Sequence, residues 1–334
     1  MRSKFSLAAV ILVLTVVLAA CGGGNSANNT GGASVSPTPS PTVAPTDAPA
    51  ESPEPTSITV THQLGETEVP VNPSKVVVFD YGVLDTLDKL GVEAVASVPQ
   101  AGVPSYLSKY EDSKYVNAGS LKEPDLETIH GISPDLIIIS GRQSTFYEEL
   151  KDIAPTIYMG VDAANYLESF TSNVTLLGQI FGKEAEAEAE LATITDVIKS
   201  VNERATANGK NGLIILVNEG NISAYGAGSR FGIIHDVLGV TPVDANIEVS
   251  THGQSVTFEY IAEKDPDYLF VVDRTAALSG EAGAKETVEN KLMENTKSFK
   301  EGNIVYLDPE YWYLSGGGLV SVAKMVNDID EAVN

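Results

Sequence analysis

The chain has 334 residues, with 45 acidic and 21 basic side chains and a formal net charge of −24 at pH 7. This length allows about two domains of ordinary size with ample core, and so acidic a chain argues against nucleic acid or an anionic membrane surface as a partner. The single cysteine excludes an internal disulfide and a cysteine-ligated metal cluster.

Residues 1–20 have the composition of a secretory signal. Arg2 and Lys4 form a basic start, and the apolar run that follows is shorter than the ~20 residues of a membrane-spanning helix. Small residues precede Cys21, and this segment resembles the bacterial lipobox, in which the cysteine after the cut receives a lipid. We therefore expect Cys21 to carry a lipid anchor; a soluble cleaved signal and an uncleaved anchor are the alternatives.

Residues 21–57 are rich in Gly, Asn and Ser and then in Pro, Thr and Ser, with three acids, no bases and no aromatic residue. Such a segment buries too little apolar surface to offset its ordering entropy. Its Pro-rich half favours extended polyproline conformation. We expect a disordered tether that lifts the following domain off the membrane through a wall layer.

Residues 58–165 alternate between strand and helix patterns and predict an N-terminal α/β lobe. Residues 58–69 have the alternation of a hairpin, and a helix is predicted over 83–90, closed by Gly91. Buried strands are predicted at 76–79, 94–97, 136–139 and 156–159.

Residues 166–208 contain no proline and predict connecting helices. The first ends near Gly182, and the second runs from Lys183 to about Ala207 with an apolar face at spacings of three and four. About 24 residues at 1.5 Å each give a helix of ~35 Å, long enough to join two lobes. Two surface helices of a single domain are the alternative. A rigid link of this kind predicts only small lobe motion.

Residues 209–334 predict a C-terminal α/β lobe, in which the strand and helix pattern restarts. Strands are expected at 213–217, 222–225, 268–272 and 304–307, and helices at 233–238, near 288–292 and at the C-terminus. A glycine-rich turn at 226–232 precedes the first of these helices, and a loop is expected at 308–318.

A seventeen-residue block occurs twice without gaps, at 126–142 and 258–274. Each copy has a short helical segment, a Pro-Asp turn, an apolar run of strand length and a terminal arginine. The ends of the helices at 87–92 and 235–240 also match. We therefore predict an α/β protein of two Rossmann-like lobes joined by a single long helix, with an arginine at the carboxyl end of a buried strand in each lobe.

The three candidate binding arginines are Arg142, Arg230 and Arg274. Arg142 and Arg274 end the two blocks, and Arg230 lies in the glycine-rich turn before a helix, where free N–H groups favour an anion. Three forked donors between two lobes predict a polyanion site. Pairing of each arginine with a carboxylate is the alternative. The glycine spacing differs from that of a dinucleotide-binding loop.

Further candidates are His252, in a polar loop, and Trp312 and Tyr313, in an aromatic cluster before the glycines at 316–318. The alternatives are a solvated histidine and a local apolar minicore.

From residue 58 onward the chain resembles the ferric-siderophore binding lipoproteins of bacterial ABC importers, which have the class III solute-binding fold. The resemblance is strongest to the branch that takes ferric catecholates of the petrobactin type. It is carried by Ser140–Arg142, Gly228–Gly232, Thr251–Gly253, Val272–Arg274 and Trp312–Leu314. It implies that Arg142, Arg230 and Arg274 grip the catecholate oxygens, and that His252 and Tyr313 ligate Fe(III) when a tetradentate siderophore leaves two positions open. Trp312 would stack on a catechol ring or an arginine.

The resemblance also implies partners and a location. Glu127 and Glu259 hold the same place in the two blocks and would dock basic pockets of an ABC permease, although a plain surface role describes most glutamates. We expect a monomer anchored by lipid on the extracytoplasmic face of a Gram-positive cell membrane. It would have no intrinsic cofactor, and Fe(III) would arrive within the siderophore complex.

Three alternatives to this function remain. The first keeps the class and changes the ligand to haem, a corrinoid or a hydroxamate siderophore. The second is a secreted hydrolase, for which the chain lacks a G-x-S-x-G elbow and a zinc-type histidine pair; we expect no enzymatic activity. The third is an adhesin, which leaves the three arginines unexplained.

Overall fold

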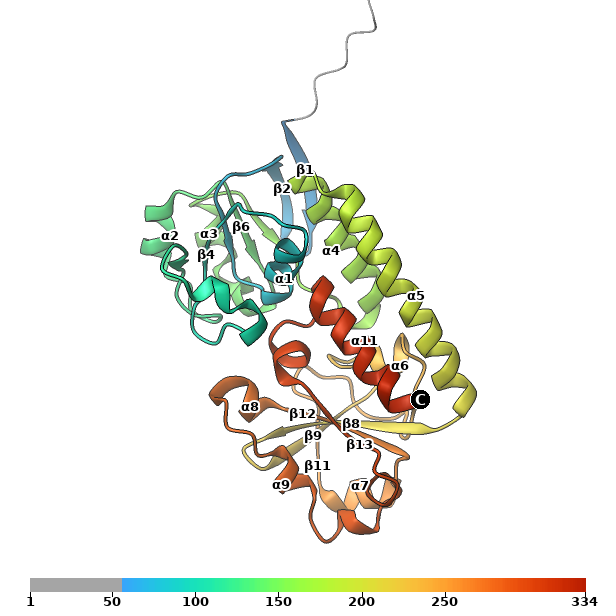
Figure 1. Cartoon of the computed structure of the whole chain (residues 1–334). Coiled ribbons are helices and arrows are strands. Elements are labelled where there is room, and N and C mark those ends of the chain that lie inside the picture. Colours follow the sequence, from blue (N-terminus) through green and yellow to red (C-terminus); the bar gives the residue numbers. More distant parts are fainter. Residues whose placement is uncertain (1–55) are drawn as a thin grey trace, which may run out of the picture. The chain divides into compact units, whose positions relative to one another are not determined.

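The computed structural model describes residues 56–334 (Figure 1). The predicted signal at 1–20, its lipid site Cys21 and nearly all of the tether at 21–57 lie outside these residues. Within the described part, no helix combines the length and the apolar character that a membrane span requires.

The first sheet has five parallel strands in the order β5-β4-β3-β6-β7. The bounds are β3 (Val76–Val78), β4 (Val95–Val98), β5 (Val116–Asn117), β6 (Leu136–Ile139) and β7 (Thr156–Tyr158). Successive residues of β6 enter two different apolar clusters, one on each face of the sheet. Burial on both faces explains why these strands are continuous apolar runs. The predicted hairpin is confirmed as β1 (Ser57–His62) and β2 (Gly65–Pro70), which pair as a separate sheet.

The second sheet is mixed rather than a simple repeat of parallel units. Its order is β11-β9-β8-β12-β13, with β10 beside β8. The bounds are β8 (Asn211–Asn218), β9 (Asn221–Tyr225), β10 (Thr241–Pro242), β11 (Gln254–Val256), β12 (Tyr268–Asp273) and β13 (Ile304–Leu307). The strands predicted at 213–217 and 222–225 are confirmed as β8 and β9, but they form an antiparallel hairpin rather than parallel strands joined by a helix. Glu219 and Gly220 both have positive φ, as a tight two-residue hairpin turn requires.

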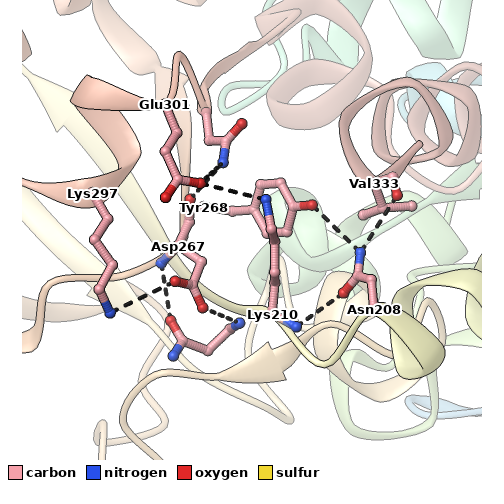
Figure 2. A network of polar contacts seen from close by, with 9 residues as sticks. Asn208, Lys210, Asp267, Tyr268, Lys297, Glu301 and Val333 are labelled. Carbon is pink, nitrogen blue, oxygen red and sulfur yellow. Dashed lines mark hydrogen bonds and ion pairs between the residues drawn. The ribbon is translucent and has the colours of Figure 1, made fainter.

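The repeated block folds in the same way twice, as α2 (Leu126–Ile132) with β6 and as α7 (Phe258–Lys264) with β12. Both helices end in a left-handed residue directly before the proline. The aspartate after each proline then accepts backbone hydrogen bonds at the start of the neighbouring strand. Asp135 accepts the N–H groups of Ser74 and Lys75, just before β3. Asp267, shown in Figure 2, accepts that of Asn211, the first residue of β8. The Pro-Asp turn therefore ties each helix end to the start of its sheet.

The connecting segment forms α4 (Tyr166–Phe181) and α5 (Glu184–Asn208), which pack against each other (Figure 1). Near its start, α5 pairs Glu190 with Lys89 at 3.0 Å, and at its end Asn208 bonds the Tyr268 hydroxyl and the Val333 carbonyl (Figure 2). Twenty-five residues span ~37 Å, so α5 reaches from the helices of the first sheet to the strands of the second. The long connecting helix is confirmed, while the predicted limits of the lobes stay predictions.

The remaining helices differ more from expectation. The first half has α1 (Tyr81–Lys89), η1 (Ser105–Glu111), η2 (Gly141–Phe146), α3 (Tyr147–Lys151) and η3 (Ala163–Asn165). The second half has α6 (Ile233–Asp236), α8 (Arg274–Ser279), α9 (Ala284–Val288), η4 (Met293–Asn295), α10 (Lys297–Lys300), the π-helical turn η5 (Glu310–Leu314) and α11 (Leu319–Val333). The helix predicted near 288–292 lies earlier in the chain, as α9, because the Asn290 side chain accepts the N–H groups of Leu292 and Met293 and forms a turn there. The loop predicted at 308–318 contains η5 instead.

Candidate functional site

A pocket of about 650 Å³ is lined by residues from both sheet regions. One wall follows β6 and β7 and includes Ser140–Arg142 and Tyr158. The other includes Gly228–Arg230, Val249–Thr251 and the turn η5. The pocket therefore lies at the carboxyl ends of the first sheet's strands, which is where open α/β sheets bind ligands.

The structure brings the three predicted arginines together on one residue, Tyr313. Arg142 Nη2 and Arg230 Nη2 donate to the Tyr313 carbonyl oxygen at 3.1 and 2.6 Å. Arg274 Nε donates to the Tyr313 hydroxyl at 2.9 Å, and its Nη1 donates to Asn218 Oδ1 at 2.5 Å. Residues from four separate segments thus converge at this point.

None of the three arginines pairs with a carboxylate within residues 56–334; the fourth arginine of this part, Arg204, pairs with Asp330. The alternative of three structural ion pairs is therefore wrong. Nearby acids are occupied by backbone donors instead. Asp273, directly before Arg274, accepts the N–H groups of Ala276, Gly283 and Ala284. Arg142 and Arg230 line the pocket with their charges unpaired by any carboxylate of this part, whereas Arg274 is not among the lining residues and meets the site through the Tyr313 hydroxyl.

Arg230 is a partly buried cation whose charge is not neutralised by a carboxylate of the described residues. Burial lowers the pKa of its guanidinium, and the charge of Arg142 lowers it further. The group lies 4.1 Å from the centre of the Tyr313 ring, a cation–π contact that partly offsets this cost. Two like charges in a partly buried pocket create a positive potential that an anion would neutralise.

Tyr313 is half-buried and lines the pocket. Burial alone would raise the pKa of its phenol, but the charge of Arg230 and the hydrogen bond and charge of Arg274 together lower it below its ordinary value. The arginines therefore favour the phenolate form, a hard oxygen donor suited to a trivalent cation.

The glycine-rich turn contributes less to anion binding than we expected. Helix α6 has only four residues, and the Gly228 N–H donates to Asp236 Oδ2 at 2.6 Å. Because a carboxylate of the chain already occupies this donor, the guanidinium of Arg230 is the group that the turn offers to an anion.

Trp312 belongs to the protein core. Its side chain is 2% exposed, and its indole N–H donates to Asp328 Oδ2 in α11 at 2.9 Å. Little of its ring is exposed, which disfavours the expected stacking of Trp312 on a catechol ring, and no arginine of the described residues stacks on it. Trp312 is nevertheless among the residues that line the pocket.

His252 lies in the turn between Ser250 and Gly253 and is exposed. Its neighbours Val249, Ser250 and Thr251 line the pocket, but His252 is not among the lining residues. The structure thus places His252 at the pocket's edge and does not bring it into contact with Tyr313. Within the described residues, no three His, Cys, Asp or Glu side chains gather into a metal site.

Glu127 and Glu259 occupy the first turns of α2 and α7 and are both exposed. Neither forms an ion pair with another described residue. The two glutamates therefore hold equivalent places in the two copies of the repeat, as predicted. Their docking to a permease stays a prediction.

The sequence analysis missed Asn218, which holds Arg274, and Tyr158, which lines the pocket. Each is a residue with a polar group at the carboxyl end of an apolar strand: Asn218 ends β8 and Tyr158 ends β7. A search for such strand ends would have identified both.

Comparison with known proteins agrees with this fold. A sequence profile of the periplasmic binding protein family matches residues 76–311. The chain is 52% identical over 279 residues to the petrobactin-binding protein YclQ of Bacillus subtilis, covering 83% of this chain and 88% of YclQ. The YclQ crystal structure aligns with a TM-score of 0.81, covering 83% of this chain and 99% of that one.

Two further relatives are more distant. The ferric-anguibactin-binding protein FatB of Vibrio anguillarum is 31% identical, over 82% of this chain and 87% of its own. The structure of the periplasmic catecholate-siderophore binding protein VctP of Vibrio cholerae is 37% identical with a TM-score of 0.78, over 82% of this chain and 99% of that one. The profile match and these relatives show that the chain belongs to the periplasmic binding protein family.

Proposed function

We propose that this protein captures a ferric siderophore with catecholate donor groups and delivers it to an ABC permease for iron uptake. The observation that carries the proposal is the meeting of Arg142, Arg230 and Arg274 at Tyr313 with no carboxylate partner among the described residues. The names of YclQ, FatB and VctP, which refer to petrobactin, ferric anguibactin and catecholate siderophores, support the ligand class.

The charge of such a ligand fits the three arginines. A ferric tris-catecholate is a trivalent cation within six phenolate oxygens, so its net charge is −3. Three guanidinium groups balance this charge, keep their protons at any physiological pH and present paired donors to neighbouring oxygens. The pocket's partial burial strengthens each of these interactions relative to water.

Tyr313 and His252 would complete the iron coordination of a tetradentate siderophore, which leaves two positions open. The lowered pKa of the Tyr313 phenol favours this role, since ligation needs the phenolate. His252 would have to move from the pocket's edge to reach the same iron. With a hexadentate siderophore neither side chain would bind the metal.

The N-terminal segment and two surface glutamates support a location for the protein and a partner. A lipid on Cys21 and the tether at 21–57 would hold the monomer at the extracytoplasmic face of a Gram-positive membrane. Glu127 and Glu259, in the matching helices α2 and α7, would meet basic pockets of the permease. The function is capture and delivery, with no catalytic step.

The test uses the chain's single tryptophan, Trp312, which adjoins Tyr313 and so reports on the pocket. Its fluorescence is followed during titration with ferric petrobactin, a ferric bis-catecholate, a ferric hydroxamate, haem and a corrinoid. The proposal expects saturable quenching at submicromolar concentration by the two catecholates only. Tighter binding of the hydroxamate, haem or corrinoid would refute the catecholate assignment.

A further inference from the structure

The segment that carries Tyr313 is fixed at both ends by residues of the first half of the chain. Tyr313 lies in η5, and the glycines 316–318 connect this turn to α11. Helix α1 contacts the start of α11, and η1 contacts η5 itself. These contacts lie outside the arginine cluster described above.

Asp85 of α1 caps α11. It is fully buried, and its carboxylate accepts the N–H groups of Val320 at 2.8 Å and Ser321 at 2.7 Å. Thr86 Oγ1 accepts the next free N–H, that of Leu319, at 3.2 Å. The first turn of a fifteen-residue helix therefore receives its capping groups from a different helix, more than 230 residues away in sequence.

Tyr106 of η1 holds the turn η5 from the other side. Its ring stacks on that of Tyr311 with centroids 4.4 Å apart and an interplanar angle of 14°. Its hydroxyl donates to Ser315 Oγ at 2.7 Å and lies 3.2 Å from Asp85 Oδ2. Ser105, its neighbour, donates its N–H and hydroxyl to Glu310 Oε2 at 3.1 and 2.6 Å.

We propose that Asp85 and Tyr106 are positioning residues that hold η5 in the place where Tyr313 meets the three arginines. The contacts of Tyr106 fall on Tyr311 and Ser315, two residues before and two after Tyr313. A shift of this turn by about 1 Å would break the Tyr313 carbonyl's hydrogen bonds, since such bonds weaken beyond ~3.2 Å. Ligand affinity thus depends on two side chains that do not touch the ligand.

The chain supplies a matched control for Tyr106. Tyr110 lies one turn further along η1, and its hydroxyl donates to Asp88 of α1 at 3.1 Å. Both tyrosines therefore join η1 to an aspartate of α1. Among the described residues, Tyr110 and Asp88 form no hydrogen bond with residues 310–321, whereas Tyr106 and Asp85 do.

The experiment compares Tyr106→Phe with Tyr110→Phe in the whole chain from residue 21 onward, first without ligand. Tyr106→Phe keeps the stacking on Tyr311 but loses the hydroxyl, so we expect a red shift of Trp312 emission and faster acrylamide quenching. Tyr110→Phe should leave both at wild-type values while lowering the melting temperature by a similar amount. Asp85→Asn, which keeps one acceptor oxygen, should change Trp312 in the same direction as Tyr106→Phe.

The effect on binding is measured next and rests on the proposed function. Tyr106→Phe should weaken the ferric catecholate by about two- to tenfold, the range for one lost hydrogen bond, and Tyr110→Phe should not. Equal Trp312 spectra in the two variants would overturn the positioning role. If the spectra differ as expected but no catecholate binds the wild type, the positioning role stands and the proposed ligand is wrong.

Discussion

Replacement of Arg230 by glutamine should separate ligand binding from fold stability. In the ligand-free protein this guanidinium carries its charge in a partly buried place beside Arg142, and both conditions lower its pKa. Its compensating contacts are one hydrogen bond to the Tyr313 carbonyl, the cation–π contact with the Tyr313 ring and a longer one, at 5.4 Å, with the Phe231 ring. Glutamine keeps a hydrogen-bond donor and removes the charge.

The two effects have different sizes. The cation–π contact contributes about 0.5–2 kcal/mol, and relief of the buried charge offsets a similar amount, so the net change in unfolding free energy should stay within about 1 kcal/mol. For a domain of this size that corresponds to a melting-temperature change of about 2–4 °C at most. A hydrogen bond to a charged ligand contributes about 1.5–3 kcal/mol, so ferric catecholate affinity should fall by about 10- to 150-fold.

Trp312 fluorescence titration and thermal unfolding of the same samples test this prediction. Arg204→Gln is the matched control, because Arg204 pairs with Asp330 between α5 and α11 and does not line the pocket. It should lower the melting temperature and leave affinity unchanged. Binding by Arg230→Gln within twofold of wild type, or an equal loss in Arg204→Gln, would refute the reasoning.

Three further predictions concern single side chains. Tyr313→Phe should remove the phenolate and weaken a tetradentate ferric bis-catecholate at least tenfold, with loss of any visible phenolate-to-iron absorption band, while a hexadentate siderophore loses less; equal losses would exclude direct ligation. His252→Ala should likewise matter mainly for tetradentate ligands in the same titrations, and an equal effect on a hexadentate one would contradict ligation by His252. Burial raises the pKa of Asp85 to about 7, so the folded chain holds this proton more tightly than the unfolded chain between about pH 4 and 7. Stability from this group should therefore decline as pH rises through that window, and Asp85→Asn should flatten the difference in melting temperature across it; an unchanged pH profile would refute the assignment.

Local sequence pattern predicted the parts of the fold that depend on local rules. Strand β6 has the predicted bounds because its four apolar residues are buried on both sheet faces and begin directly after a Pro-Asp turn. The long helix α5 was predictable from the spacing of its apolar face, four of whose residues are buried. The repeat predicted the arginines after β6 and β12, because two copies of one sequence block that fold alike place their last residue just beyond the same strand.

Tertiary contacts decided the parts that the sequence did not predict. The turn η5 is held by Ser105 and Tyr106, about 205 residues earlier in the chain. No local sequence pattern predicts contacts between segments so far apart. Packing of η5 against α11 buries Trp312, which composition alone presents as a ligand platform. Helix α8 begins at Arg274 because Asp273 caps it, a role that a buried strand pattern hides.

Iron anomalous diffraction from a crystal of the protein with a ferric catecholate siderophore tests the central claim most directly. The account predicts a single iron peak in the pocket, with the catecholate oxygens within hydrogen-bond distance of the guanidinium groups of Arg142, Arg230 and Arg274. An iron peak outside this pocket, or one inside it with no guanidinium group of the three arginines in contact with the catecholate oxygens, would contradict the account.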